Sequence, residues 1–555
     1  MKGVGSLDKI QIKNIRSLKD TGQVALSPIT LLVGENSSGK STFLRLFPLI
    51  KQSISKRTDG PLLWAGDVDD YVDFGSFAET ITNDGSTAMT LYFSFPISKF
   101  GTYLTYRETR ISRSFPGLKK LTNNIPDQAD VQYSITISQD NGHEYISQLE
   151  VRLYQSQFKF LLSPPSKKRR PGGETICVDA KQIPYDSDMK KERLLHYGTE
   201  FVASDIFGYT LPALSSVVDK LMQEIFDGVP ADIDEDEFVL RRYHDYPISL
   251  MRLIGQYLCF GITWENIRMA LTEKAQEESD MTEMLLLKFV LRLGELPEER
   301  LQEILSAFKL LFFYSFFSEI EEYLNTYFRQ VHYIAPLRAT AERYYRLRNL
   351  AIDEVDYQGK NLAMFLSGLS EARMRKFQSW TREYFGFSVI VDKKGGHLSV
   401  KIALTDGGNP VNMSDTGFGY SQILPIITQL WDLSTNPRPM RSRREKIPLV
   451  IAIEQPELHL HPALQAKLAK AFLSSIQLAK ENGYFLQLII ETHSETIVNY
   501  FGMAIANGNL QKEDVSVVLF DKNLRTKHTQ VQSSSYDQNG FLLDWPIGFF
   551  APKEW

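Results

Sequence analysis

The residues with the clearest capacity for chemistry form the segment 34–42, GENSSGKST. This segment matches the phosphate-binding pattern G-x-x-x-x-G-K-[ST]. In that pattern the glycines let the backbone curl around a polyphosphate, and successive N–H groups offer partial positive charge. Lys40 would place a full charge on the β- and γ-phosphates, and the Ser41 hydroxyl would hold a magnesium ion. The segment therefore predicts a nucleotide site. The alternative, which we favour less, is a plain Gly/Ser turn.

Two flanking patterns place this loop between a strand and a helix. Residues 29–33, ITLLV, predict a buried strand, and residues 43–46, FLRL, predict the start of a helix. A helix N-terminus that follows such a loop favours bound phosphate. The phosphate-binding residues predicted from this context are Gly34, Asn36, Ser37, Ser38, Gly39, Lys40, Ser41 and Thr42.

A second group of reactive side chains lies more than 400 positions downstream. Residues 449–454, LVIAIE, predict a buried strand that ends in Glu454. An acid at this place is suited to hold magnesium opposite the loop hydroxyl. Gln455 and Glu457 follow directly, and Pro462 begins a predicted helix at a position where its missing N–H costs little.

A third group follows the next predicted strand, residues 485–490. The strand runs into Glu491-Thr492-His493-Ser494. Ligands of open parallel sheets bind at the carboxyl ends of the strands. His493 is therefore predicted to lie at the nucleotide site.

A glycine-spaced loop lies upstream, at residues 414–422, SDTGFGYSQ, before a helical pattern at 423–433. Such a loop offers backbone and hydroxyl donors at a helix N-terminus, which makes it a second phosphate-binding device. One fold does not need two such devices for one nucleotide. The second loop therefore predicts a dimer in which each copy completes the other's site.

The composition is that of an ordinary soluble protein, with 43% hydrophobic and 23% charged residues in a chain of 555. The net charge of −5 argues against non-specific coating of nucleic acid. The only cysteines, Cys177 and Cys259, form no C-x-x-C zinc motif. The N-terminus lacks the apolar core of a signal peptide, and the apolar run 310–317 is too short to span a bilayer. These features predict a cytoplasmic protein with no membrane contact.

The chain pattern changes twice along its length. Residues 86–162 alternate apolar and polar positions, which predicts antiparallel strands. A helical pattern occupies about 190–330, and an α/β pattern returns after it. We therefore expect three parts: the N-terminal part of a nucleotide-binding head with a β lobe (1–185), a mainly helical insertion (186–330), and the C-terminal part of the head with a short tail (331–555).

In their order along the chain, these motifs resemble those of ABC-type ATPase heads. The resemblance is to the soluble class shared by RecF, the SMC proteins and the OLD-family ATPases. The quoted segments are GENSSGKST, a glutamine at Gln52, SDTGFGYSQ, IEQPELHLHP and ETHS. The resemblance covers residues 7–80 and 400–521. It implies an α/β P-loop head, a mixed sheet flanked by helices plus an antiparallel β lobe, in which two heads sandwich two ATP molecules.

The resemblance also implies a role for each matched residue, with ATP and Mg²⁺ as cofactors. Phosphate and magnesium would be bound by Lys40, Ser41 and Thr42. Gln52 and Glu454 would complete the metal shell, and His493 would sense the γ-phosphate. The residues acting across a homodimer, or a higher oligomer, would be Gly417, Gly419, Ser421 and Gln422.

The end of the chain resembles one branch of these ATPases. Residues 536–540, YDQNG, and 544–550, DWPIGFF, are similar to the tail of PtuA-like proteins from Septu and retron anti-phage systems. The resemblance implies an HNH nuclease partner, and allows a reverse transcriptase or retron nucleic acid in the same complex.

The chain departs from the family pattern at Gln455, where a carboxylate normally orients the attacking water. An amide can position water but cannot accept a proton at useful pH. Glu457 and Glu491 are candidate replacements. Either ATP binds tightly with slow or conditional hydrolysis, or glutamine is normal in a competent subfamily. Only 34 residues follow Asp521, so a C-terminal nuclease domain is not expected.

Weaker signals have two interpretations each. The run 167–170, KKRR, could contact nucleic acid, although a solvated charge run is favoured. His459 and His461 are expected to shape a loop rather than bind metal. Arg338 and Arg343 could reach a phosphate or form structural ion pairs. The aromatic run 311–317 is expected to be helical core rather than a protein-docking face, and Trp545, Phe549 and Phe550 could pack on the head or anchor a partner.

Two functions from different classes follow. The first is an ATP-dependent switch and scaffold that controls a separate nuclease in anti-phage defence. The alternative is a RecF-like repair ATPase that binds DNA directly.

Overall fold

In the computed structural model the described residues are 7–56, 58–67, 70–98, 111, 115–122, 128–162, 164, 174–179, 181–183, 245–272, 287, 290–291, 293–336, 338–348, 352–404, 407–435, 447–523 and 525–544. The chain divides into two compact units. The first comprises Met1–Lys56, Leu62–Ser86 and Thr326–Trp555, and the second comprises Arg57–Pro61 and Thr87–Asn325. The boundaries expected at residues 185 and 330 remain predictions, since residues 184–244 lie outside the described ranges.

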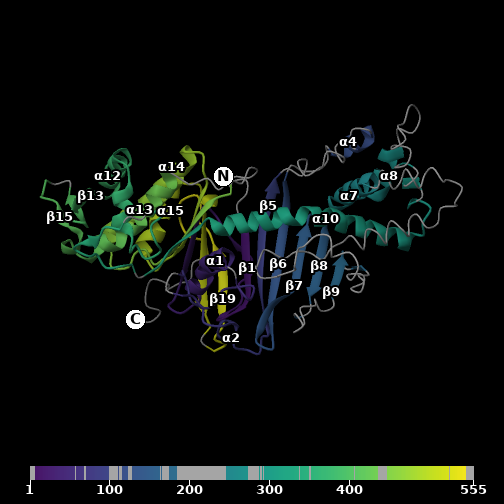
Figure 1. Cartoon of the computed structure of the whole chain (residues 1–555), viewed down its shortest axis with the longest axis horizontal. Coiled ribbons are helices and arrows are strands. Elements are labelled where there is room, and N and C mark those ends of the chain that lie inside the picture. Colours follow the sequence, from purple (N-terminus) through teal and green to yellow (C-terminus); the bar gives the residue numbers. More distant parts are fainter. Residues whose placement is uncertain are drawn as a thin grey trace. The chain divides into compact units, whose positions relative to one another are not determined.

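A six-stranded mixed sheet forms the centre of the first unit (Figure 1). Its strand order is β11-β16-β17-β4-β18-β19, and every pair is parallel except β18 with β19. The strands are β11 (Val331–Ile334), β16 (Leu449–Glu454), β17 (Leu486–Glu491), β4 (Ile29–Gly34), β18 (Val515–Lys522) and β19 (Thr529–Ser534). All residues of β4, β16 and β17 are buried, as their unbroken apolar sequences require in a parallel sheet.

The register brings the functional ends of these strands together. Glu454 lies opposite Glu491, and Gly34 lies opposite Phe520. The carboxyl ends of β16, β17, β4 and β18 therefore meet at one edge of the sheet. This is the edge at which open α/β sheets bind their ligands.

Helices cover both faces of the sheet. Alternate residues, such as Leu31, Ile451 and Leu488, belong to one core cluster with α13 (Phe418–Thr435), α14 (Pro462–Glu481) and α15 (Glu495–Ala506). Side chains at the intervening positions point to the opposite face, because side chains alternate along a strand. The helix α1 (Lys40–Ser55) lies on that face, where Phe43 packs against Phe520 with ring centroids 5.7 Å apart. The predicted α/β architecture is confirmed.

Helix α1 runs against the direction of the strands. It starts at the carboxyl edge of the sheet after the loop of β4, and near its end Lys51 donates a 2.6 Å hydrogen bond to the carbonyl of Val331, the first residue of β11. Ser41 and Arg45 are one turn apart and share a face of this helix. The helix therefore presents its first turns to the carboxyl edge and its last turn to the amino edge.

Smaller elements complete the first unit. The strands β1 (Lys9–Ile15), β2 (Leu18–Asp20) and β3 (Val24–Ala25) pair antiparallel. A second antiparallel sheet contains β12 (Tyr345–Arg346), β13 (Phe387–Lys394), β14 (His397–Leu404) and β15 (Val411–Asn412). The remaining helices are α2 (Phe77–Thr80), α11 (Leu362–Gly368), α12 (Glu371–Phe385), η3 (Met413–Asp415) and η4 (Lys512–Asp514).

The second unit contains an antiparallel meander and helices. Consecutive strands pair from β5 to β10, and the predicted alternation is confirmed in β5, where Met89, Leu91, Phe93 and Phe95 are buried. The strands are β5 (Ala88–Ser98), β6 (Gln128–Asp140), β7 (His143–Leu153), β8 (Ser156–Leu162), β9 (Glu174–Val178) and β10 (Lys181–Ile183). The helices are α4 (Pro116–Thr122), α7 (Asp245–Cys259), α8 (Trp264–Thr272) and α10 (Glu298–Arg329).

The aromatic run 311–317 lies in α10, and those of its side chains that the structure describes are buried in the core, as predicted. Phe313 stacks on Phe158 with ring centroids 4.1 Å apart, and Phe317 stacks on Tyr133. Both α10 residues are almost fully buried.

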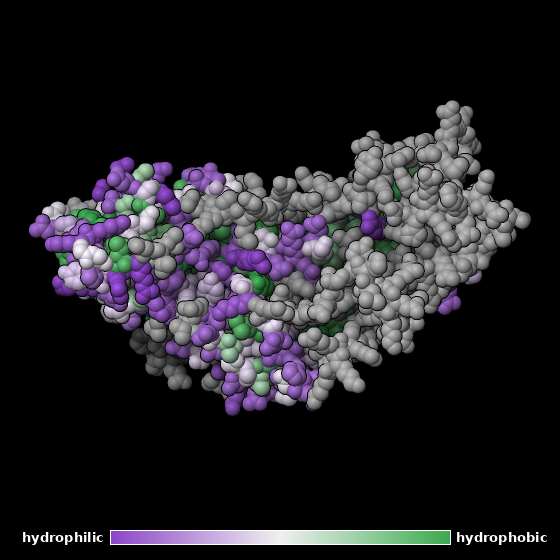
Figure 2. Space-filling model, viewed as in Figure 1, coloured by the Kyte–Doolittle hydropathy of each residue, from purple (hydrophilic) through white to green (hydrophobic). Residues whose placement is uncertain are grey.

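Some predicted features lie outside the described residues: the basic run 167–170 and the aromatic residues Trp545, Phe549 and Phe550. Within the described helices, none is long and apolar enough to cross a membrane. The coloured surface in Figure 2 is mainly hydrophilic, with hydrophobic residues scattered among hydrophilic ones.

Candidate functional site: a nucleotide cavity at the carboxyl edge of the sheet

The loop between β4 and α1 has the backbone that a phosphate cradle needs. Ser37 and Gly39 have positive φ angles, 60° and 96°. A Cβ atom at Gly34 would lie 2.3 Å from the carbonyl oxygen of Phe520, so only glycine allows β4 and β18 to approach this closely. Helix α1 has no capping side chain at Gly39, which leaves its first N–H groups to an anion.

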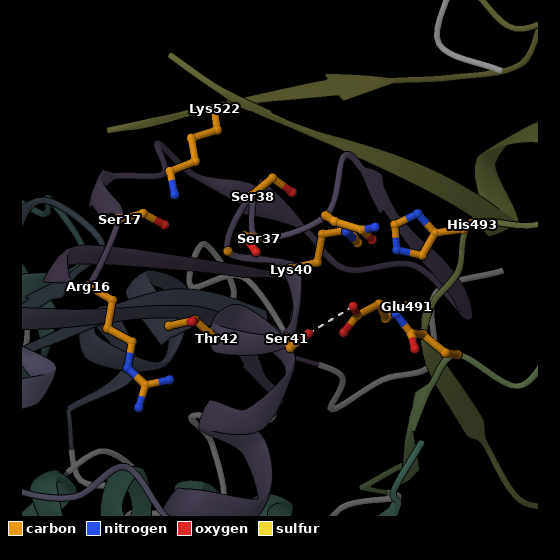
Figure 3. A pocket seen from close by; sticks show the side chains of 13 residues that line it. Arg16, Ser17, Ser37, Ser38, Lys40, Ser41, Thr42, Glu491, His493 and Lys522 are labelled. Carbon is orange, nitrogen blue, oxygen red and sulfur yellow. Dashed lines mark hydrogen bonds between the residues drawn. The ribbon is translucent and has the colours of Figure 1, made fainter. Parts of the chain in front are cut away.

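A cavity of about 410 Å³ opens over this loop (Figure 3). Arg16, Ser17 and Lys522 lie on one side of it, and Glu491 and His493 lie on the other. The full lining is Arg16, Ser17, Asn36, Ser37, Ser38, Gly39, Lys40, Ser41, Thr42, Gln455, Glu491, His493 and Lys522. Of the predicted loop residues, Asn36 to Thr42 all line the cavity, whereas Gly34 does not belong to the lining.

The loop itself holds Lys40. Its Nζ donates to the carbonyl oxygens of Gly34 at 3.1 Å and of Glu35 at 2.7 Å. The side chain is nearly buried, and this burial lowers the pKa of Lys40. An ammonium group has three donors, so one remains for a ligand after these two contacts.

The carboxylate that contacts Ser41 is that of Glu491. Ser41 Oγ donates a 2.8 Å hydrogen bond to Glu491 Oε1. Glu491 is 1% exposed, and among the described residues its Oε2 has no hydrogen-bond partner. Burial, with the nearby charge of Glu454, raises the pKa of Glu491 to about 7.

Glu454 has other partners. Its Oε1 and Oε2 accept hydrogen bonds of 2.6 and 2.8 Å from the guanidinium of Arg45, and Tyr333 donates a further bond of 2.8 Å to Oε1. Glu454 is 2% exposed and does not line the cavity. In the structure Glu454 is therefore paired with Arg45 and Tyr333, and the magnesium role predicted for it from the sequence stays a prediction.

Glu457 positions the segment that carries His493. Its carboxylate accepts the backbone N–H of His493 at 2.6 Å and the hydroxyl of Thr492 at 2.9 Å. Both oxygens are thus engaged, and burial raises the pKa of Glu457. These contacts make Glu457 a positioning residue and argue against the general-base role considered from sequence.

His493 itself lines the cavity, and its predicted contact with the γ-phosphate stays a prediction. Its Nε2 has no hydrogen-bond partner among the described residues. Burial, together with the charge of Lys40, lowers the pKa of His493 to about 4. The imidazole is therefore neutral near pH 7 and can donate to, or accept from, a ligand in the cavity.

Gln455 also lines the cavity, at the place expected for a water-orienting residue. Its φ is 41°, and its backbone N–H donates to the carbonyl of Glu491 at 2.9 Å. This contact ties the ends of β16 and β17 together and fixes where the amide side chain starts.

Gln52 requires a correction. It lies on α1 about 17 Å along the helix axis from Ser41, at a rise of 1.5 Å per residue. Its amide donates to the carbonyls of Leu63 and Val72 and accepts from the N–H of Val72. Because α1 runs toward the amino edge of the sheet, Gln52 does not reach the cavity and cannot belong to its metal shell. It instead holds the segment 63–72 on the helix.

The predicted trans-acting loop lies apart from the cavity of its own chain. Gly417 is exposed with a φ of 84°, and Gly419 is half-buried, whereas Ser421 and Gln422 are buried in the first turn of α13. None of these four belongs to the cavity lining. They do not contribute to the nucleotide site within one copy.

The four weaker candidates have structural partners in the first unit. Arg343 forms a bidentate pair with Asp415 at 2.7 and 2.8 Å, and Arg338 donates to the backbone carbonyl of Glu454 at 3.1 Å. His461 caps α14 by accepting the N–H of Ala463. His459 turns the loop with a φ of 61°. Among the described residues, no group of three or more His, Cys, Asp and Glu side chains could hold a metal.

Sequence reasoning missed three residues of the cavity, Arg16, Ser17 and Lys522. Lys522 ends an apolar strand at the carboxyl edge of the sheet, a signal that could have identified it. Arg16 and Ser17 lie in the turn between β1 and β2, and reach the cavity only through tertiary packing.

The loop, the order of the strands and the convergence of Lys40, Ser41 and His493 define a P-loop ATPase core. Comparison with known proteins agrees. The family model described as AAA ATPase domain matches residues 6–167 and 314–498, more than half of the chain. The chain belongs to this family.

Two further comparisons are less informative. Among solved structures, the chain is similar to the SMC head domain from Thermotoga maritima, with a TM-score of 0.29 and 8% identity over 95% of this chain and 98% of that chain. No curated protein matches it.

Proposed function

We propose that this protein is an ATP-dependent switch, in which two copies close around ATP and Mg²⁺ and hydrolyse the nucleotide slowly or conditionally. The observation that carries the proposal is the cavity itself, where a phosphate loop, Lys40, Gln455 and His493 face one space of about 410 Å³.

Different residues of the cavity would contact different parts of the bound nucleotide and its magnesium ion. The N–H groups of the loop and of the first turn of α1 would hold the phosphates, with Lys40 as the point charge. Bound magnesium would neutralise negative charge on the β- and γ-phosphates. The oxygen donors suit this hard cation. Ser41 offers a hydroxyl oxygen, and one oxygen of the adjacent Glu491 carboxylate has no hydrogen-bond partner among the described residues. His493 would hydrogen-bond the terminal phosphate.

Slow hydrolysis is inferred from Gln455 and Glu457, whereas Glu491, which lines the cavity and contacts Ser41, stays a candidate replacement for the catalytic carboxylate. Gln455 can orient a water through its amide but cannot take its proton. Glu457 is fully engaged in holding His493 and Thr492. ATP binding would therefore stabilise the closed dimer, and the bound nucleotide would be hydrolysed slowly.

The dimer is inferred from the position of the loop 414–422. This loop carries exposed glycine backbone at the start of α13, yet contributes nothing to the cavity of its own chain. A second copy could receive it over the terminal phosphate, as helix N-termini favour anions.

Sedimentation velocity of the purified chain tests the proposal. Addition of ATP and Mg²⁺ is expected to convert monomer to dimer, and Gly419→Asp, which adds bulk and negative charge to the loop, should prevent this while nucleotide still binds. A dimer of Gly419→Asp as stable as that of the natural chain would refute the shared site. Failure of the natural chain to bind ATP would refute the switch altogether.

We further propose that the switch controls a separate HNH-type nuclease in an anti-phage complex, in which a reverse transcriptase or retron nucleic acid could also take part. The support is the similarity of the tail to PtuA-like proteins. Co-expression with the neighbouring reading frame, followed by co-purification with and without ATP, tests it. Tight and salt-sensitive binding of duplex DNA by this chain alone would instead favour the RecF-like repair function.

A further inference from the structure

A single threonine contacts three segments that line the nucleotide cavity. Thr529 is the first residue of β19 and the register partner of Lys522 on β18. It is 4% exposed and does not itself line the cavity. Ser17 and Lys522 lie on the side of the cavity opposite His493 (Figure 3). Thr529 therefore lies behind this side, next to the residues that form it.

The hydroxyl of Thr529 holds one peptide of the phosphate loop. Its Oγ1 donates a 2.8 Å hydrogen bond to the backbone carbonyl of Ser38, a loop residue that is fully buried. In a planar trans peptide the C=O and N–H groups point in opposite directions. Because the carbonyl of Ser38 points toward Thr529, the N–H of Gly39 points away from it. This N–H is one of the loop groups that can bind an anion.

The same threonine holds the turn between β1 and β2. Its backbone N–H donates to the carbonyl of Ser17 at 2.8 Å, and its Oγ1 is hydrogen-bonded to Ser17 Oγ at 3.0 Å. A Cβ atom at Gly39 would lie 2.9 Å from Ser17 Oγ, so the turn packs directly on the phosphate loop. The contacts of Thr529 therefore meet where these two segments touch, one residue from Arg16.

We propose that Thr529 is a positioning residue of the nucleotide site, which orients the phosphate loop and holds the turn of Arg16 and Ser17 against it. This rests on the proposed nucleotide-binding function. The two side-chain contacts of Thr529 both end on residues that line the cavity, Ser17 and Ser38. Since Thr529 does not line the cavity, its effect on a ligand passes through these two neighbours.

The alternative is a role in the stability of the sheet alone. Strand β19 is the outermost strand of the six-stranded sheet, and it pairs with β18 through the backbone from Thr529 to Ser534. The hydroxyl of Thr529 takes no part in this backbone pairing. Removing the hydroxyl therefore leaves the strand pairing in place and separates the two roles.

Nucleotide titration of matched variants of the full chain tests the proposal. Thr529→Val keeps the shape and the backbone contacts but removes the hydroxyl, whereas Thr529→Ser keeps the hydroxyl. With a fluorescent ATP analogue, Thr529→Val is expected to bind about tenfold more weakly, the effect of about one lost hydrogen bond. Thr529→Ser should stay within about threefold of the natural chain, because both side-chain contacts remain.

Two further measurements make the comparison specific. Thr526→Val makes the same chemical change in the turn between β18 and β19, and it should leave the affinity unchanged. Melting curves show the temperature at which each variant is folded, and the titrations are made below it. If Thr529→Val does not fold, Thr529→Ala removes the hydroxyl with a smaller side chain and takes its place.

The outcomes are distinct. An unchanged affinity in Thr529→Val, whatever its melting temperature, would overturn the proposal and leave Thr529 a role in stability alone. Equal losses in Thr529→Ser and Thr529→Val would also overturn it, because the hydroxyl would then not be responsible. In both cases, ATP binding by the natural chain would show that the proposed function stands. If the natural chain binds no nucleotide, the proposed function fails and this proposal fails with it.

Discussion

The backbone N–H of His493 donates a 2.6 Å hydrogen bond to the carboxylate of Glu457, which also accepts the hydroxyl of Thr492. Glu457 lies on the loop after β16, and His493 lies after β17. The contact therefore links the ends of two neighbouring strands and sets the direction from which the imidazole enters the cavity.

Glu457→Ala is expected to weaken ATP binding through His493. The substitution leaves a buried N–H and a hydroxyl without their acceptor, at a cost of about 1–3 kcal/mol. A loss of about tenfold in ATP affinity should result, matching that of His493→Ala. Because both variants remove the same interaction, the double variant should be no worse than either single one. Fully additive losses in nucleotide titrations would show that Glu457 acts independently of His493.

Lys40→Ala should abolish tight nucleotide binding without unfolding the protein. Charge-assisted hydrogen bonds contribute about 1.5–3 kcal/mol each, so a loss of at least about 100-fold is expected with a fluorescent ATP analogue. Lys512→Ala is the control, because Lys512 lies in η4 before β18, at the amino edge of the sheet. Normal affinity in Lys40→Ala would refute the assignment of the phosphate loop.

Gln455→Glu is expected to raise ATP turnover. The residue lines the cavity, and a carboxylate there could accept the proton of the attacking water, an effect worth about 100-fold or more in general-base catalysis. Steady-state phosphate release measures the change, and Gln455→Ala, which supplies no base, should show no increase. An unchanged rate in Gln455→Glu would mean that this position does not limit hydrolysis.

Gly502→Ala should loosen the tail from α15. A Cβ atom at Gly502 would lie 2.4 Å from the carbonyl oxygen of Gly540, so the two segments could not keep their approach. Overpacking of this kind costs about 1–3 kcal/mol. Thermal unfolding and limited proteolysis near residue 540 would report it. Gly368→Ala, which meets no atom within 4 Å, is the control and should leave both unchanged.

The sequence by itself determined the parts of this protein that depend on local pattern. The spacing of Gly34, Gly39 and Lys40 predicts a phosphate cradle because backbone curvature and helix start are local properties. The apolar runs at 29–33, 449–454 and 485–490 predicted the three strands that now carry the site.

Only the tertiary structure decided which side chains meet. Glu454 and Glu491 both end apolar strands, and the sequence gives no order for those strands across the sheet. The placement of β17 between β4 and β16 puts Glu491 next to Ser41 and leaves Glu454 to Arg45. Likewise the direction of α1 carries Gln52 away from the cavity, while the packing of the β1–β2 turn brings Arg16 to it. Such contacts join residues hundreds of positions apart, and so depend on strand order and helix direction rather than on spacing.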